Sequence, residues 1–137
     1  HTDSRGDTYP HRRRDDGTWL YRADDDVGFS VLYSDRGELA SGRRDLARHL
    51  SDALADAGFP PYPGCHYEGL YDHGPVPGSF VDRRGLFMLR RPTMPSVIIE
   101  THNAKDVGAS DRWEEERTHT AFARALIVGL TRLLYAP

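Results

Sequence analysis

The sequence contains little cysteine and little lysine, and it has no long apolar run. Cys65 is the only cysteine among the 137 residues, so the chain forms no internal disulfide. A single cysteine also does not distinguish a reducing compartment from an oxidising one. Lysine occurs once, at Lys105, among 18 basic residues. No window approaches the ~18 consecutive apolar residues of a membrane-spanning helix, so no membrane span is expected.

Composition predicts one soluble domain over residues 1–137. Hydrophobic residues make up 38% of the chain and charged residues 28%, with a mean hydropathy of -0.64. The net charge of -3 gives no reason to expect nucleic-acid binding. The basic run His11–Arg14 is followed at once by Asp15 and Asp16, which favours a solvated loop over a phosphate site.

Hydrophobic patterning predicts an α/β chain. We expect a mixed or mostly parallel twisted sheet flanked by helices, because the apolar strands are continuous and therefore covered on both faces. The Gly- and Pro-rich segment 59–82 reads mainly as a long loop. The expected strands are 27–33, 85–91 and 95–101, with a short strand or hairpin at 18–22, and the expected helices are 43–57 and 112–135.

Capping patterns place the ends of the two helices. Ser41 is the expected N-cap of the first helix, and Gly58 is its expected stop. Asp111, followed by Glu114, predicts a capping box for the closing helix. The apolar stripe of that helix is expected to lie against the sheet, with Phe122, Leu126 and Leu130 buried.

The stretch "MPSVIIETHN" carries the strongest candidate for chemistry. Glu100 follows an apolar strand, where a carboxylate costs free energy unless it is paired or used. It could act as a general base, or it could pair with Arg90 or Arg91. His102 would share the face of Glu100 on a continuing strand. It could orient Glu100 or contact substrate, although a loop histidine bonded to backbone is the simpler interpretation.

A second polar cluster, "CHYEGLYDH" at 65–73, is less specific. Its His66, Glu68, Asp72 and His73 match no zinc-ligand spacing. Cys65 has no positioned base that would make it a nucleophile. A surface loop, or one that faces substrate, is therefore favoured.

The order of these segments resembles a known family. "GFSVLYS", a helix, "GLFMLRRPTMPSVIIET" and a long closing helix are similar to the C-terminal portion of the catalytic domain of zinc-dependent N-acetylmuramoyl-L-alanine amidases. The Met-Pro before an apolar strand ending in glutamate is the most specific piece. The opening "HTDS" resembles a family segment whose histidine binds zinc.

The resemblance implies a function and a site. It implies hydrolysis of the amide between N-acetylmuramic acid and L-alanine in peptidoglycan, in the periplasm, the cell envelope or outside the cell. Glu100 would be the catalytic carboxylate and His1 a ligand of the Zn²⁺ cofactor. Arg90 would hold a stem-peptide carboxylate or neutralise Glu100, and His102 would lie near the substrate.

Two departures from the family leave alternatives open. The family's other two zinc ligands would precede His1, so we expect the N-terminal part of the domain and the export signal upstream, and little zinc binding or activity from these residues alone. "ETHN" also departs, because the family usually has a small or apolar residue where His102 stands. A non-catalytic cell-wall binding domain, or another zinc hydrolase such as an exopeptidase, remains possible.

Overall fold

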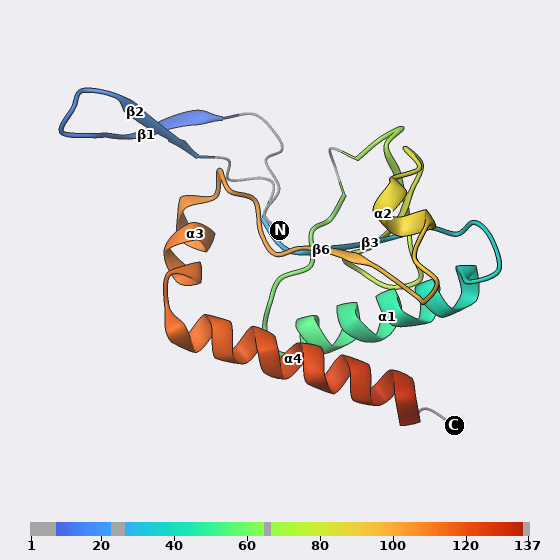
Figure 1. The fold of residues 1–137 in the computed structure, drawn as a ribbon. Helices are drawn as coiled ribbons and strands as arrows, with labels where there is room; N and C mark the ends of the chain where they lie inside the picture. Colours follow the sequence, from blue (N-terminus) through green and yellow to red (C-terminus); the bar gives the residue numbers. More distant parts are fainter. Residues whose placement is uncertain (1–7, 23–26, 65–66, 136–137) are drawn as a thin grey trace.

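A four-stranded sheet with helices on both faces forms the body of the molecule, and a separate hairpin stands beside it (Figure 1). The computed structural model describes residues 8–22, 27–64 and 67–135. Its strands are β1 (Tyr9–Arg13), β2 (Trp19–Arg22), β3 (Ser30–Tyr33), β4 (Tyr71–His73), β5 (Ser79–Asp82) and β6 (Ile98–Glu100). Its helices are α1 (Ala40–Asp56), α2 (Phe87–Arg90), α3 (Val107–Trp113) and α4 (Glu116–Tyr135).

The body sheet has the order β4-β5-β3-β6 and is mixed. The central pair β3 and β5 is parallel, whereas β6 runs antiparallel to β3 and β4 runs antiparallel to β5. The α/β class predicted from the sequence is therefore confirmed, with a mixed sheet.

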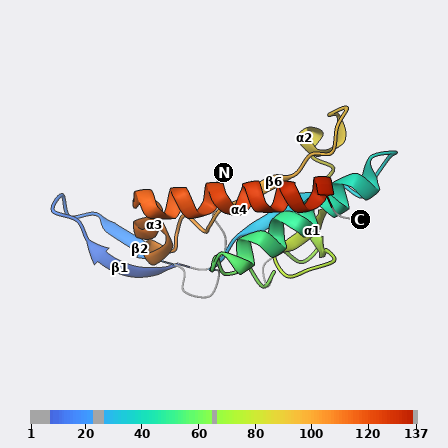
Figure 2. The ribbon, with the colours of Figure 1, turned by 90° about the horizontal axis from the view of Figure 1, so that it is seen from below.

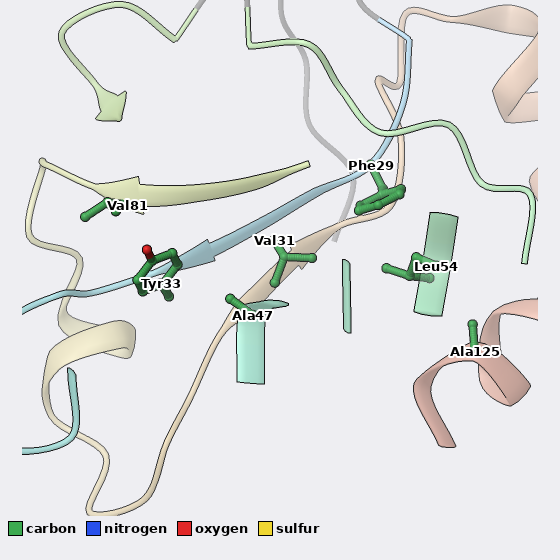
Figure 3. Close-up of a cluster of buried hydrophobic side chains, with 7 residues drawn as sticks. All are labelled: Phe29, Val31, Tyr33, Ala47, Leu54, Val81 and Ala125. Atoms are coloured by element: carbon green, nitrogen blue, oxygen red, sulfur yellow. The ribbon is translucent and has the colours of Figure 1, made fainter. Parts of the chain in front are cut away.

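One face of the sheet packs on α1, and Ala125 of α4 reaches the edge of the same cluster. Side chains alternate along a strand, so Phe29, Val31 and Tyr33 point to this face. With Ala47 and Leu54 of α1 they form a buried cluster that also includes Val81 and Ala125 (Figure 3). This cluster is one of two layers of the apolar core.

The opposite face is covered by α2 and by the segment before β4. Leu32 points to this side and packs with an aromatic group. Tyr67 meets the rings of Tyr62 and Phe80 edge to face, at centroid distances of 4.8 and 5.0 Å. The long segment after α1 is thus part of the second core layer rather than a plain loop.

Helix α4 lies along α1 (Figure 2), which differs from the expected packing on the sheet. The contact is made by small residues: Ala125 and Gly129 are buried, and a Cβ at Gly129 would lie 3.0 Å from the His49 carbonyl oxygen. Leu126 is only half-buried, and Leu130 is 45% exposed. The prediction that both are buried is wrong, because small residues let the two helix backbones approach closely.

The strand predicted at 85–91 is also wrong. After β5, the buried Asp82 carboxylate accepts a hydrogen bond from the Leu86 N–H at 2.7 Å, and Gly85 turns the chain with φ +75°. The next residues form the short helix α2, which leaves Phe87 and Met88 about two-thirds exposed. The strand paired with β3 is instead "SFVD", inside the segment expected to be mainly loop.

Helix ends agree with the sequence in part. Gly58 has φ +87° directly after α1, as expected for a C-terminal stop. Helix α1 begins at Ala40 without a side-chain cap, so Ser41 is not the cap. Asp106, rather than Asp111, caps a helix: its Oδ1 accepts from the Ala109 N–H at 3.0 Å, and α3 ends before α4 begins.

The hairpin of β1 and β2 confirms the strand or hairpin expected at 18–22. The basic run His11–Arg14 was expected to be a loop, and most of it is strand β1 instead. Every residue of β1 is exposed, and among the described residues its only strand partner is β2.

Candidate functional site

Glu100 is the last residue of β6, and its register places it opposite Ser30 on β3. It is 9% exposed and Ser30 is fully buried. Ile98, two residues earlier, packs into the aromatic layer, so Glu100 points toward that same face of the sheet. The structure therefore places a nearly buried carboxylate at the end of a strand, on the face of the sheet opposite α1.

Polar groups accompany Glu100 on this face. The Ser30 hydroxyl and the Tyr67 hydroxyl lie 3.2 Å apart and share a hydrogen bond. The start of β3 is fixed by the segment after α1, since Phe29 donates its N–H to the Pro60 carbonyl and accepts from Tyr62 N–H, each at 2.9 Å. Gly28 permits this approach with φ +114°. These hydrogen bonds fix the backbone at the start of β3, beside Ser30 and the paired Glu100.

His102 takes a different place from the one expected on a continuing strand. The strand ends at Glu100, and the His102 ring stacks on Trp113 of α3, with centroids 5.5 Å apart and planes 14° apart. Its Nδ1 lies 3.0 Å from the Thr101 hydroxyl oxygen. His102 is 8% exposed, so it is a packed histidine between β6 and α3.

A pocket of about 320 Å³ is lined in part by Thr101 and His102, the two residues that follow Glu100. Phe59 and Trp113 form its aromatic wall, with centroids 5.8 Å apart. Arg117 donates a hydrogen bond to Glu115 and lowers the pKa of that carboxyl group, and the two side chains form an ion pair at the pocket. Other lining residues include Gly28, Thr101, His102, Arg112 and Thr118.

Arg90 lies at the end of α2 with an exposed side chain that folds over Gly85. Its carbonyl oxygen accepts from Nη2 of the buried Arg43 at 3.4 Å. Arg43 Nη1 also donates to the Arg36 carbonyl at 2.9 Å, so Arg43 links three segments of backbone. The role of Arg90 toward a substrate stays a prediction.

The remaining expected ligands fall outside the described residues or apart from one another. His1, Cys65 and His66 lie outside the described residues. Within residues 8–22, 27–64 and 67–135, no three His, Cys, Asp or Glu side chains come together as a metal site. These residues alone therefore do not fit a catalytic zinc centre, which needs three protein ligands. Nor does any helix among them have the length and apolarity to cross a membrane.

Sequence reasoning missed several neighbours of Glu100 and His102. Ser30 and Tyr67 could be found only through strand register and through the fold of the long segment after α1. Trp113 falls within the closing helix predicted at 112–135, yet it belongs to α3 and packs on His102. Asn103 is fully buried, and its Oδ1 accepts from the Lys105 N–H at 3.1 Å, which shapes the turn after Thr101.

No family model and no curated protein matches the chain, but solved structures do. The fold of this chain matches about half of the fold of N-acetylmuramyl-L-alanine amidases. One match is the N-acetylmuramyl-L-alanine amidase Ami1 from Mycobacterium smegmatis, with a TM-score of 0.61 and 27% identity over 81% of this chain and 48% of that one. The apo form of Ami1 from Mycobacterium abscessus matches with a TM-score of 0.63 and 22% identity, over 82% and 50%.

A third match is the CwlD amidase from Clostridioides difficile, solved in complex with the GerS lipoprotein. Its TM-score is 0.60 at 14% identity, over 87% of this chain and 53% of that one. The resemblance to the amidase family predicted from the sequence is thus confirmed. The chain spans about half the length of each of these structures.

Proposed function

We propose that this chain is part of an enzyme that hydrolyses the amide between N-acetylmuramic acid and L-alanine in peptidoglycan, with Glu100 as its general base and acid. The observation that supports this most is a nearly buried carboxylate at the end of β6, in a chain 27% identical to an amidase of similar fold. Such an enzyme acts in the cell envelope, where its polymer lies.

The chemistry assigned to Glu100 is proton transfer. Its carboxylate takes a proton from a water molecule as the water oxygen attacks the amide carbon. The same group then gives that proton to the departing nitrogen as the carbon–nitrogen bond breaks. The first products are the lactyl carboxylic acid on the sugar and the free amine of the alanine. The acid proton then passes to that amine, so that a carboxylate and an ammonium group remain and both atoms and charges balance. A low-exposure site favours this role, since little bulk water competes for the proton.

Zinc belongs to the proposal through the family likeness, with His1 as one ligand. A bound zinc ion supplies an acidified water and polarises a carbonyl. The described residues do not by themselves form such a site, so no step of the reaction is assigned to the metal. Arg90 and His102 are proposed only as substrate neighbours, with a smaller effect than Glu100.

The test compares Glu100→Gln with Glu114→Gln in the complete enzyme. Glu114 is exposed on the turn between α3 and α4, so it controls for the loss of one carboxylate. We expect Glu100→Gln to lower the release of stem peptides from purified peptidoglycan by roughly 10²-fold or more. Glu114→Gln should cleave like the parent, and melting temperature and zinc content should not change in either.

Two results would redirect the proposal. If Glu100→Gln cleaves like the parent while His102→Ala is inactive, Glu100 is not the general base and His102 is the essential residue of "ETHN". If the parent itself releases no peptide, hydrolysis fails and the alternative of a cell-wall binding domain applies.

A further inference from the structure

The β1–β2 hairpin lies apart from the four-stranded sheet that carries Glu100. It forms a sheet of its own and extends away from the body in both views (Figures 1 and 2). A lone two-stranded hairpin is marginally stable in water. Tyr9, Trp19 and Tyr21 are each about half exposed.

The strand register sorts these side chains into two faces. Pro10 pairs with Tyr21 and Arg13 pairs with Trp19. Directly opposed residues share a face, as do residues two apart on one strand, so Trp19 and Tyr21 lie side by side about 7 Å apart with Arg13 at the end. We name this the Trp19 face. The other face carries Tyr9, Arg12, Leu20 and Arg22.

The tip of the hairpin is locally ordered. Asp16 Oδ1 accepts from the Thr18 N–H at 2.9 Å and from the Thr18 hydroxyl at 2.6 Å. Arg14 N–H donates to the Thr18 carbonyl at 2.8 Å, and Gly17 supplies the positive φ. Arg13 Nε donates to the Gly17 carbonyl at 3.1 Å, which uses one of its five N–H donors. This bond fixes the Arg13 guanidinium at the turn, at the end of the face that carries Trp19.

We propose that the Trp19 face binds the glycan strand of peptidoglycan, with Trp19 and Tyr21 stacked on sugar rings and Arg13 on a stem-peptide carboxylate. This inference rests on the proposed function for the identity of the polymer. The C–H face of a pyranose ring is apolar and slightly positive, which suits the negative face of an aromatic ring. Tyr and Trp offer that surface with only two side-chain torsions to immobilise, and an arginine–carboxylate pair adds a charge-assisted hydrogen bond.

The charge of the hairpin favours this polymer over nucleic acid. Its four arginines, Arg12, Arg13, Arg14 and Arg22, are offset by Asp15 and Asp16 at the tip, in a chain of net charge -3. Nucleic-acid binding depends on neutralising many phosphates. A surface with two aromatic rings and a small positive excess fits a polymer of neutral sugars with scattered carboxylates.

The experiment measures binding separately from cleavage. Complete protein carrying Glu100→Gln, which is expected to cleave the polymer at least about 10²-fold more slowly, is sedimented with purified insoluble peptidoglycan at low and moderate salt. We expect Trp19→Ala and Tyr21→Ala each to weaken binding at least about fivefold, the scale of aromatic stacking platforms. Tyr9→Ala is the matched control, because it removes an equally exposed ring from the other face.

Charge is tested in the same assay. Arg13→Gln should weaken binding and reduce its salt dependence, whereas Arg12→Gln on the opposite face should bind like the parent. Trp19→Phe should retain most of the binding, which separates stacking from a general effect on the hairpin. Melting temperatures of all variants should match the parent.

The outcomes distinguish this inference from the proposed function. If Trp19→Ala and Tyr9→Ala bind alike, or if RNA of matched length displaces the polymer, the glycan assignment is overturned. It is also overturned if the Trp19 variants lose only self-association in sedimentation. If the parent binds through the Trp19 face but releases no stem peptide, binding stands and hydrolysis fails.

Discussion

The body and the β1–β2 hairpin treat their aromatic residues in opposite ways. In the body, Tyr62 and Phe80 are each 1% exposed and pack with other rings. On the hairpin, Trp19 and Tyr21 are each 51% exposed. Burial of apolar area stabilises a fold, so the body's rings contribute to stability and the hairpin's rings contribute little. The body, which holds Glu100, therefore uses its rings for packing, whereas the hairpin leaves its rings accessible to the proposed glycan ligand.

The largest effect should come from the core. Leu54→Ala removes a fully buried side chain between α1 and β3 and should lower the free energy of unfolding by about 2–5 kcal/mol. Trp19→Ala should change it by no more than about 0.5 kcal/mol, as for most surface substitutions. Urea denaturation followed by circular dichroism measures both. Leu134→Ala, at a 75% exposed leucine, is the control of equal chemistry.

A loss from Trp19→Ala equal to that from Leu54→Ala would break the comparison. It would mean that the hairpin packs on the body in solution and that its aromatic residues are structural.

A smaller loss of stability is expected at Gly28, where the start of β3 lies close to the segment after α1. A Cβ here would meet the Pro60 carbonyl oxygen at 2.5 Å, and the backbone has φ +114°. Gly28→Ala should therefore cost about 1–3 kcal/mol. Gly37→Ala is the matched control, because its φ is also positive but a Cβ would meet nothing within 4 Å.

Thermal unfolding of the two glycine variants would sharpen the picture of the body. If the two substitutions lower the stability equally, the loss comes from the positive φ alone. The segment after α1 would then lie farther from β3 than the structure shows.

The smallest effect concerns the tip of the hairpin. Hydrogen bonds from Thr18 lower the pKa of Asp16, so its carboxylate stabilises the turn above the ordinary pKa of an aspartate. That contribution is lost as the pH falls through the lowered pKa of the folded state. Amide exchange of Arg14 should therefore speed up at acid pH relative to its intrinsic rate, and Asp16→Ala should abolish this dependence. Asp15→Ala should leave it unchanged.

Element types with strong local signals could be predicted from the sequence. Helix α1 shows a regular apolar stripe and a following glycine, and β3 and β6 are continuous apolar runs, so each lies where periodicity placed it. Helix α2 misled because "LFML" is apolar, yet Phe87 and Met88 face outward and only Leu89 is fully buried. A four-residue apolar run does not distinguish strand from helix.

The predicted cap at Asp111 and the observed cap at Asp106 show the same limit. Asp106 and Asp111 both precede helix-compatible residues, but only Asp106 accepts an N–H at the start of a helix. Asp111 lies inside α3, which ends two residues before α4 begins. The break was not visible in the stripe, because Trp113 continues the apolar pattern while its ring packs on His102 and Phe59.

The sequence by itself determined that the chain is α/β and that a carboxylate ends an apolar strand at Glu100. Both follow from local patterns of apolar residues, which act over a few neighbours along the chain. Only the tertiary structure decided that Ser30 lies opposite Glu100, that His102 stacks on Trp113, and that the hairpin exposes one aromatic face. Those arrangements depend on strand register and on contacts between residues far apart in the sequence, whose partners no local pattern specifies.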